Sequence, residues 1–561
     1  MPTPVSVFRR LAIKRPLLLA LGVAVLAVVP YLNGLGNGFA FDDVAIAAEN
    51  PRIRSIEGIR RIFMTDWWDG ATSRTSVHRP IAMVTFSADY AAARVGETGP
   101  PPARLPDRSA FPFHLQNLLW HAAASVALFV LVIELFASPA LAFVTAALFA
   151  VHPVHTEAVY GIVGRSELIA AFFVFACLVV AWRIVRDDAA GFGRPALAGF
   201  LLLLALLSKE HAIVVPAVPL IWLFLGSPRR SFRLLMASLV AGALVFLAIR
   251  AAVLGSITGL GEAPAALTDP NNVIATAEGA ARWLTPVRVF GEVSRLLVFP
   301  KTLSVDYSSR QIPVVTAPDL ATVLCLLALI GLAASAILLR RRAPAASFGI
   351  LFFFLTWALA SNFVVPIGTI LGERLLYLPS AGICLAIASG LVAAGRRLRV
   401  PVAALTAVLV LLGATRTFAR APDWKDNLTL FASAAEACPR SCKVHFNLAI
   451  ELGLVGRTRE AIDHFERALE LGPNDAKIHN NLAGLLAGEG KLDAAIAHLE
   501  QAVRIDPELA ESHFNLGSVL RQVGRIDEAI AQYEAVLRLK PDDADARANL
   551  REAQEALRPR P

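Results

Sequence analysis

The sequence predicts an all-α protein in two parts, a polytopic membrane helix bundle followed by a C-terminal solenoid of short helices. Hydrophobic residues make up 56% of the 561 residues, and the mean hydropathy is +0.58. Charged residues make up 17%, whereas soluble domains carry about 25%. Long apolar runs are confined to residues 1–420, and a 34-residue repeat fills most of the rest. We therefore expect a membrane domain at 1–420, a linker with a degenerate helix at 421–441, and soluble repeats at 442–561.

The membrane domain contains about 11 stretches that are apolar and long enough to span a bilayer, for which about 20 residues suffice. The first stretch follows a basic segment but has no evident small-residue cleavage site, so we interpret it as a retained span and not as a signal peptide. The predicted spans are 16–33, 113–136, 139–152, 166–185, 195–208, 211–227, 233–254, 318–339, 346–365, 374–394 and 400–419.

One further segment, 282–300, is amphipathic. It carries Arg282, Arg288, Glu292 and Arg295 at near-helical spacing, and a lipid-exposed span would be strongly destabilised by four such charges. We therefore predict a helix at the membrane surface, within an outer segment at 255–316.

Clusters of arginine predict the orientation of the chain, because short loops rich in Arg and Lys stay in the cytoplasm. The clusters lie at 183–194, 229–233, 340–342 and 396–399. With the N-terminus inside and eleven spans, the loop 34–112 and the repeats lie on the non-cytoplasmic side. The Ala-, Arg- and Leu-rich, Lys-poor composition favours a bacterial chain, hence an inner membrane with periplasmic repeats. These clusters also explain the net charge of +8, so nucleic-acid binding is not expected.

The C-terminal part repeats every 34 residues, with Pro at the end of each unit, Asn-Leu in the first helix, Gly between the helices and Ala at the helix contact. This pattern is the tetratricopeptide signature. Such repeats bury their apolar faces by stacking, and the concave face of the stack is a surface for peptide binding; the alternatives are packing against the membrane domain or self-association. The repeated positions are Pro439, Pro473, Pro507 and Pro541; Asn447, Asn481, Asn515 and Asn549; Gly456, Gly490 and Gly524; and Ala461, Ala495 and Ala529.

The predicted topology places fifteen polar residues of the membrane domain at or near its outer face. Convergence on one face predicts a single site there. The residues are Asp42, Asp43, His114, His152, His155, Glu157, Arg165, Glu167, Lys209, Glu210, His211, Asp269, Asp306, Glu373 and Arg374.

Two kinds of group in this set suggest chemistry. Asp42 and Asp43, a few residues beyond the first span, could supply a general base or hold an acceptor hydroxyl, although Asp43 could instead cap a helix. Arg165, Lys209 and Arg374 are candidate phosphate ligands. The alternatives are snorkelling to the interface for Arg165 and an internal ion pair with Glu373 for Arg374.

Metal and disulfide sites are weakly indicated. His155 and Glu157 could bind a metal, but three well-spaced ligands are not visible, so no metal site is predicted and a divalent metal is left open. Of the five cysteines, those in apolar spans are expected to be inert packing residues. Cys438 and Cys442 form either a short-loop disulfide or two thiols.

Taken in order, the polar motifs resemble the transmembrane and tetratricopeptide-repeat O-mannosyltransferases over nearly the whole chain. One departure is Asp269-Pro270-Asn271, where the family tends to have Asp-Asn-Pro. The motifs that carry the resemblance are Phe41-Asp42-Asp43, Arg79-Pro80, His114-Leu115-Gln116-Asn117, the block His152 to Glu167, Ser208-Lys209-Glu210, Phe299-Pro300 to Asp306-Tyr307-Ser308, and Glu373-Arg374-Leu375-Leu376-Tyr377-Leu378-Pro379.

The resemblance implies a C-type glycosyltransferase fold, a polyprenyl-phosphate sugar as donor and an acid in the first outer loop. Carried onto this chain, the acid is Asp42 or Asp43, with Asp42 favoured as the base. Arg165, Lys209 and Arg374 would bind the donor phosphate. No Gly-rich loop for a nucleotide sugar is evident, and no cofactor is predicted. The other site candidates are Arg79, His114, His152, His155, Glu157, Glu167, Glu210, Asp306 and Glu373.

The leading hypothesis is an inverting transferase that moves a sugar, mannose by the resemblance, from the lipid donor to Ser or Thr hydroxyls of exported proteins. The repeats would present the acceptor, so the expected partners are membrane lipid, the lipid-linked sugar and acceptor proteins. The alternative is a non-enzymatic membrane scaffold that recruits periplasmic proteins through its repeats. A transporter would need charges near mid-membrane and inverted repeats, and neither is visible.

Overall fold

A computed structural model describes residues 4–69, 77–95, 102–187, 191–226, 232–255, 272–308, 310–398 and 401–557. Helices and turns make up these residues and no strand occurs among them, which confirms the all-α prediction. The chain divides into two compact units: a membrane unit, 1–305 with 314–430, and a repeat unit, 306–313 with 431–561. The predicted outer segment 255–316 is therefore shared between the units. Asp269, Arg229, Arg230 and Arg399 lie outside the described residues.

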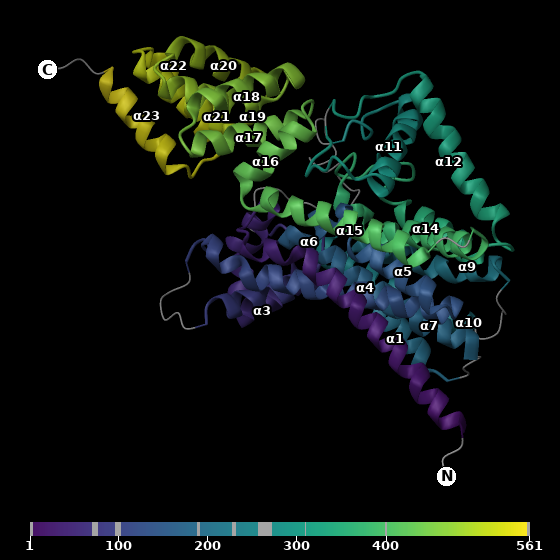
Figure 1. Cartoon of the computed structure of the whole chain (residues 1–561). Helices are drawn as coiled ribbons and strands as arrows, with labels where there is room; N and C mark the ends of the chain where they lie inside the picture. Colours follow the sequence, from purple (N-terminus) through teal and green to yellow (C-terminus); the bar gives the residue numbers. More distant parts are fainter. Residues whose placement is uncertain are drawn as a thin grey trace. The chain divides into compact units, whose positions relative to one another are not determined.

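The membrane unit consists of long helices joined by short 3-10 segments (Figure 1). Its α-helices are α1 Pro4–Val28, α2 Ile56–Met64, α3 Pro80–Ala93, α4 Phe111–Phe136, α5 Pro139–Ala150, α6 Thr156–Tyr160, α7 Arg165–Asp187, α8 Gly193–Ser208, α9 Val218–Phe224, α10 Phe232–Leu254, α11 Ala281–Val298, α12 Leu320–Leu338, α13 Pro344–Trp357, α14 Tyr377–Leu398 and α15 Val402–Arg420. The helix α16, Asn427–Ala437, leads towards the repeats.

In the part of the chain that the structure describes, seven helical segments are long and apolar enough to cross a membrane, or eight if one bent pair counts as a single span. The other three predicted spans fall on shorter apolar helices, Gly193–Ser208, Glu210–Phe224 and Pro344–Trp357. Length and composition alone thus support fewer than the eleven predicted spans. The shortfall arises because irregular backbone replaces helix after Trp357 and at Lys209. The seven segments are Pro16–Gly36, Asp107–Phe136, Ile162–Asp187, Phe232–Leu254, Leu320–Leu338, Glu373–Gly395 and Val402–Trp424.

The segment predicted to lie at the membrane surface forms α11. Its apolar side, including Phe290 and Val293, is buried within the unit. Its charged residues pair outside that face: Arg288 contacts Asp319 at 2.8 Å, and Arg295 contacts Glu292 at 2.8 Å. The helix is therefore amphipathic, and it is not among the segments apolar enough to span.

Glycine allows two helix pairs of the membrane unit to approach closely. A Cβ atom on Gly242 of α10 would lie 2.5 Å from the carbonyl oxygen of Gly199 on α8. A Cβ atom on Gly382 of α14 would lie 2.2 Å from the carbonyl oxygen of Gly349 on α13. Small residues at such contacts are the usual means by which membrane helices pack, because lipid supplies no hydrophobic driving force between them.

A break between α5 and α7 creates the irregular backbone on which the candidate site is built. The pair Pro139–Ala150 and Pro153–Tyr160 bends by 50°. Pro153 has no N–H to continue the helix, and the His152 side chain caps the new turn by accepting from the Val154 N–H at 3.2 Å. The chain then turns again through Ile162–Gly164 before α7 begins. Backbone N–H and C=O groups that would otherwise bond to each other within a helix can therefore bond to other segments.

Among the described residues of the repeat unit, α16 is followed by three helix pairs and one further helix. Gly456, Gly490 and Gly524, which end the first helix of each pair, have φ of 77°, 78° and 83°. Glycine adopts this conformation without steric cost, and the next amide, such as that of Arg457, bonds back to Leu452 at 2.9 Å in a Schellman arrangement. The helices are α17 Cys442–Leu454, α18 Thr458–Leu471, α19 Ala476–Gly488, α20 Leu492–Ile505, α21 Ala510–Gln522, α22 Ile526–Leu539 and α23 Ala544–Ala556.

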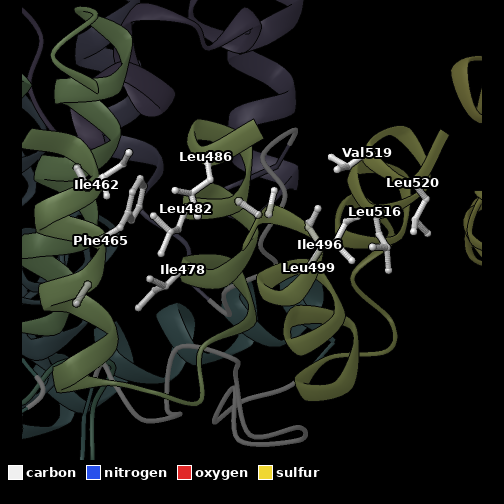
Figure 2. Close-up of a cluster of buried hydrophobic side chains, with 14 of the residues drawn as sticks. Ile462, Phe465, Ile478, Leu482, Leu486, Ile496, Leu499, Leu516, Val519 and Leu520 are labelled. Atoms are coloured by element: carbon white, nitrogen blue, oxygen red, sulfur yellow. The ribbon is translucent and has the colours of Figure 1, made fainter. Parts of the chain in front are cut away.

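The repeats share one continuous hydrophobic core. Figure 2 shows side chains from successive repeats meeting in a row, with Phe465 and Leu482 from neighbouring repeats in the same cluster. Ala461, Ala495 and Ala529 are fully buried at the contacts within each pair. The Cys442 thiol donates to the carbonyl oxygen of Ala468 at 3.3 Å. Stability of the unit therefore depends on stacking and not on any single repeat.

A polar contact recurs with the repeat period. In the first repeat, Nδ1 of His445 lies 2.9 Å from Nδ1 of His464, and Nε2 of His445 lies 3.1 Å from the Pro439 carbonyl oxygen. His479 and His498 repeat the contact at 2.9 Å. Gln532 takes the place of the second histidine in the third repeat. Each of these pairs joins the first helix of a repeat to the second.

We expect Leu482→Ala to destabilise the repeats by about 2–5 kcal/mol, because it removes a fully buried side chain from a stacked core. Leu482 is 1% exposed. Hydrogen exchange of the amides in α17–α22 of the full chain should accelerate, while amides of the membrane unit should not change. Leu454→Ala is the matched control, since Leu454 is 76% exposed. Equal effects of the two substitutions would contradict the stacked-core account.

Candidate active site

The two adjacent aspartates of the first outer loop have different environments. Asp43 is 2% exposed, and its carboxylate accepts hydrogen bonds from the Val163 N–H at 2.9 Å and the Ala40 N–H at 3.4 Å. Asp42 keeps 23% of its side chain exposed. Phe41, which precedes them, has φ of 57°, a conformation that costs a non-glycine residue about 1–2 kcal/mol. Asp43 thus anchors the turn, and Asp42 is the carboxylate that a substrate could reach.

Asp42 faces a basic residue from the start of α14. Its Oδ2 lies 3.4 Å from an η-nitrogen of Arg374. The same guanidinium lies 3.5 Å, through Nε, from the buried carboxylate of Glu157, and the Arg374 backbone N–H donates to Glu157 at 2.8 Å. Glu157 therefore holds the backbone of Arg374 at this position. Both contacts of the guanidinium, to Asp42 and to Glu157, are long.

This trio lines a small cleft. The broken helix supplies one wall through Gly161 and Gly164, and Trp424, which follows α15, packs against Gly161. Most of the residues around Asp42 lie in turns and 3-10 segments and not in long helices. The lining residues are Ala40, Phe41, Asp42, Asp43, Glu157, Gly161, Val163, Gly164, Arg374 and Trp424.

A second group of charges lies at the junction of α8 and the following 3-10 segment, Glu210–Ala217. The Lys209 ammonium contacts Glu167 at 2.7 Å, and His211 Nδ1 lies 3.5 Å from the same carboxylate. Arg79, at the start of α3, holds Glu210 through two hydrogen bonds of 2.9 and 2.7 Å. The structure thus brings the predicted residues Arg79, Lys209 and Glu210 into one region, each with a partner of opposite charge.

The two groups of charges are close enough to act on each other. Glu167 interacts electrostatically with Arg374 and with Glu157. Lys209 likewise interacts with Arg374. Two of the three cations predicted to bind phosphate, Arg374 and Lys209, therefore act on each other, but only Arg374 lines the cleft with Asp42.

Arg165, the third candidate phosphate ligand, lies in the interior of the membrane unit and does not line the cleft. It is fully buried, forms an ion pair with Asp89 of α3, and donates to Asn117 at 2.7 Å and to the Phe113 carbonyl at 2.6 Å. Its guanidinium also lies over the Phe86 ring. The N–H groups of its guanidinium bond to these partners inside the unit. This geometry does not support the interpretation of Arg165 as a phosphate ligand.

The predicted histidines make structural hydrogen bonds to other segments. Nε2 of His114 lies 3.1 Å from the Gly38 carbonyl oxygen, and Nε2 of His152 lies 3.0 Å from that of Leu297. Nε2 of His155 lies 2.8 Å from the Ser380 hydroxyl. Glu373 is also buried and accepts from the Ser304 N–H at 2.7 Å. These side chains hold the site's segments together and do not line the cleft.

Asp306 belongs to the repeat unit, whereas the cleft is formed by residues of the membrane unit. Its carboxylate accepts from the Ser441 hydroxyl at 2.8 Å and from the Ser308 N–H at 3.0 Å. Within the described ranges, no group of three His, Cys, Asp or Glu residues is arranged to hold a metal ion.

Three residues of the site region were not predicted. Asn427 and Trp424 fall in the stretch taken as a linker, and nothing in their local sequence marks them. Asp89 could have been identified, because it is the only charged residue of α3, and a lone acid in an apolar helix needs a cationic partner when buried.

We expect Asp43 to give the protein a distinctive pH dependence. Burial raises the pKa of Asp43 from 3.8 to about 7, against backbone hydrogen bonds that lower it. The folded chain then holds a proton that the unfolded chain releases, so this contribution to the free energy of unfolding is present below about pH 4 and is lost as the pH rises to 7. Thermal unfolding in detergent between roughly pH 5 and pH 8 should show a larger decline for the wild type than for Asp43→Asn. Parallel curves would contradict this prediction.

The sequence of this chain is similar to those of several known proteins. The chain is 29% identical over 449 residues to a protein O-mannosyl-transferase of Caenorhabditis elegans, which covers 78% of this chain and 60% of the relative. It is 28% identical over 477 residues to protein O-mannosyl-transferase TMTC3 of Homo sapiens, covering 78% of this chain and 49% of the relative. The chain therefore spans about half the length of the human protein.

The repeats have matches of their own. Residues 474–542 match the family described as Tetratricopeptide repeat, which confirms that prediction. Two solved structures are also similar. The first TPR of Spaghetti (RPAP3) bound to an HSP90 peptide is 23% identical, with 21% of this chain and 92% of that chain covered and a TM-score of 0.21. The TPR protein YrrB is 25% identical, with 26% and 72% covered and a TM-score of 0.22.

The apolar helices and these relatives together identify an integral membrane protein. The resemblance seen in the polar motifs is confirmed: over 78% of its length, this chain is similar to proteins named as protein O-mannosyl-transferases, and it carries tetratricopeptide repeats.

Proposed function

We propose that this chain is a membrane glycosyltransferase that moves mannose from a polyprenyl-phosphate donor to Ser or Thr hydroxyls of exported proteins. The relatives named as protein O-mannosyl-transferases support the reaction class. The observation that carries the proposal is the cleft in which Asp42, partly exposed, faces Arg374 at 3.4 Å. A base and a cation at one opening are the two groups that transfer of a phosphate-linked sugar requires.

The reaction is a single displacement. Asp42 accepts the proton of the acceptor hydroxyl while the hydroxyl oxygen forms a bond to the anomeric carbon. The bond from that carbon to the phosphate oxygen breaks, and the polyprenyl phosphate leaves with the electron pair. One displacement inverts the anomeric configuration. The proton then passes from Asp42 to solvent or to the departing phosphate, which restores the base.

Arg374 and Lys209 stabilise the leaving phosphate in this proposal. The Asp42–Arg374 contact is long, so a bound phosphate can replace it and leave Asp42 available for the acceptor. Glu157 keeps Arg374 in place during the exchange through the backbone N–H contact at 2.8 Å. A lipid-linked donor suits this arrangement because its phosphate lies at the membrane interface, beside helices that are themselves embedded.

The repeats present the acceptor in this proposal, and both the repeats and the cleft lie on the periplasmic side of a bacterial inner membrane. Stacked helical repeats offer an extended surface suited to an unfolded polypeptide. Arginine-rich short loops support the orientation, because such loops remain in the cytoplasm.

Reconstitution of the purified chain in liposomes tests this function. Synthetic polyprenyl-phosphate mannose and a Ser/Thr-rich peptide should yield a peptide heavier by one hexose, with the anomeric configuration inverted relative to the donor. Nucleotide-linked mannose alone should give no product. A chain lacking residues 440–561 should still modify a short peptide slowly, whereas a scaffold would give no transfer in any arm. Absence of transfer from the lipid donor, or transfer from the nucleotide sugar alone, would overturn the proposal.

A further inference from the structure

A short segment that begins in the last turn of α15 is hydrogen-bonded along the loop that carries Asp42. This segment, residues 418–427, is called the connector here because α16 and the repeats follow it. Its contacts run in register along residues 33–41, and all of them lie within the membrane unit. They are Asn33 Nδ2 to the Phe418 carbonyl at 2.8 Å, Asn37 Nδ2 to the Ala421 carbonyl at 2.9 Å, the Gly38 N–H to the Lys425 carbonyl at 2.9 Å, and the Phe41 N–H to Asn427 Oδ1 at 2.6 Å.

The last of these contacts differs from the others in two respects. It is the one in which the connector contributes a side chain, so it depends on the identity of residue 427. This contact is also made by the backbone N–H of Phe41, whose φ is positive at 57°. A non-glycine residue holds this conformation only where its surroundings impose it.

The turn that presents Asp42 is thus fixed at both ends. Asn427 holds the amide of Phe41 on one side of Asp42, and the Val163 N–H holds the carboxylate of Asp43 on the other. The Asp42 side chain is therefore directed by its neighbours, since its own contact to Arg374 is long.

We propose that Asn427 is a positioning residue that keeps Asp42 directed into the cleft. This inference rests on the proposed function, in which Asp42 is the base. Asn427 acts through the Phe41 amide and does not touch substrate. Its effect is on the geometry of proton transfer, which is sensitive to displacements of about 1 Å.

The local structure makes Asn427 a clean target for substitution. Helix α16 is capped by its neighbour, Asp426, whose Oδ1 accepts from the Thr429 N–H at 2.8 Å. Loss of the Asn427 side chain therefore leaves the helix cap intact. Lys425 offers a matched control, because its side chain is exposed and only its carbonyl oxygen contacts the loop.

The experiment compares Asn427→Ala, Asn427→Asp and Lys425→Ala in the liposome assay. Asn427→Ala should lower kcat by about tenfold to a hundredfold with an unchanged KM for polyprenyl-phosphate mannose. Asn427→Asp keeps an oxygen that can accept from the Phe41 N–H, so it should recover most of the rate. Lys425→Ala should match the wild type. Hydrogen exchange at the Phe41 amide should accelerate in Asn427→Ala and stay slow in Asn427→Asp, which reports the contact independently of activity.

The outcomes separate this inference from the proposed function. If Asp42→Asn abolishes transfer while Asn427→Ala transfers at the wild-type rate, the positioning role is wrong and the function stands. Loss of transfer that Asn427→Asp does not recover, with Phe41 exchange unchanged, also overturns the role. Full transfer by Asp42→Asn overturns the function itself, and the positioning role with it.

Discussion

Replacement of Asp42 by asparagine should lower the transfer rate by about 100-fold or more, the contribution expected of a general base. The carboxamide has nearly the shape of the carboxylate but cannot take up the acceptor proton. Stability should be almost unchanged, because Asp42 is partly exposed and its contact to Arg374 is 3.4 Å long. Initial rates at saturating lipid donor and peptide, together with thermal unfolding in detergent, measure both quantities.

Two matched substitutions define the specificity of this result. Asp69→Asn removes an exposed ion pair with Arg61 in the same loop, a contact worth about 0–1 kcal/mol, and should alter neither rate nor stability. Asp43→Asn should act mainly on stability, because Asp43 accepts backbone hydrogen bonds in the interior. A wild-type rate for Asp42→Asn would exclude Asp42 as the base.

Replacement of Arg165 by methionine should have the largest effect on folding. The substitution leaves Asp89 as an uncompensated buried charge, and breaking such a pair costs about 3–5 kcal/mol. It also removes the donors that hold Asn117 and the Phe113 carbonyl. Thermal unfolding of the detergent-solubilised chain should show a lower Tm, and the KM for the lipid donor measured on the surviving protein should be unchanged.

The double variant Arg165→Met with Asp89→Leu is the control for this prediction. Replacing both members of a buried ion pair by apolar groups is often far less destabilising than removing one, so the double variant should recover much of the lost Tm. A wild-type Tm for Arg165→Met combined with a raised donor KM would contradict the structural role and support phosphate binding by Arg165.

Arg165 and Arg374 illustrate what the sequence could and could not predict at the site. Both precede an apolar span and stand beside a glutamate or a serine, so local sequence does not distinguish them. The structure distinguishes them by distant partners: Asp89, from α3, pairs with Arg165, whereas Glu157 and Asp42 leave Arg374 at the cleft. Such pairings depend on how helices pack, and no spacing rule in a single sequence specifies them.

The fold was more predictable than the site because it follows from periodicity. A 34-residue period fixes where each repeat begins, and apolar runs mark the long helices. The short spans were less predictable, since a break such as that at His152 and Pro153 depends on a local cap as well as on composition. Adjacent residues also differ: Asp42 and Asp43 are indistinguishable by spacing, yet the side chain of Asp42 is partly exposed and that of Asp43 is buried.

The histidine pairs of the repeats have a consequence for acid tolerance. A proline carbonyl can only accept, so His445 must carry its hydrogen on Nε2 and present a lone pair from Nδ1. His464 must then donate from Nδ1. One added proton can reside on the outer nitrogen of His464 without disturbing this arrangement, but a second would place hydrogens on both facing nitrogens. Burial already lowers the pKa of His445 and of His464. The His445–His464 pair can therefore hold one added proton and keep its hydrogen bond, whereas a second proton would break the bond that joins the two helices of this repeat.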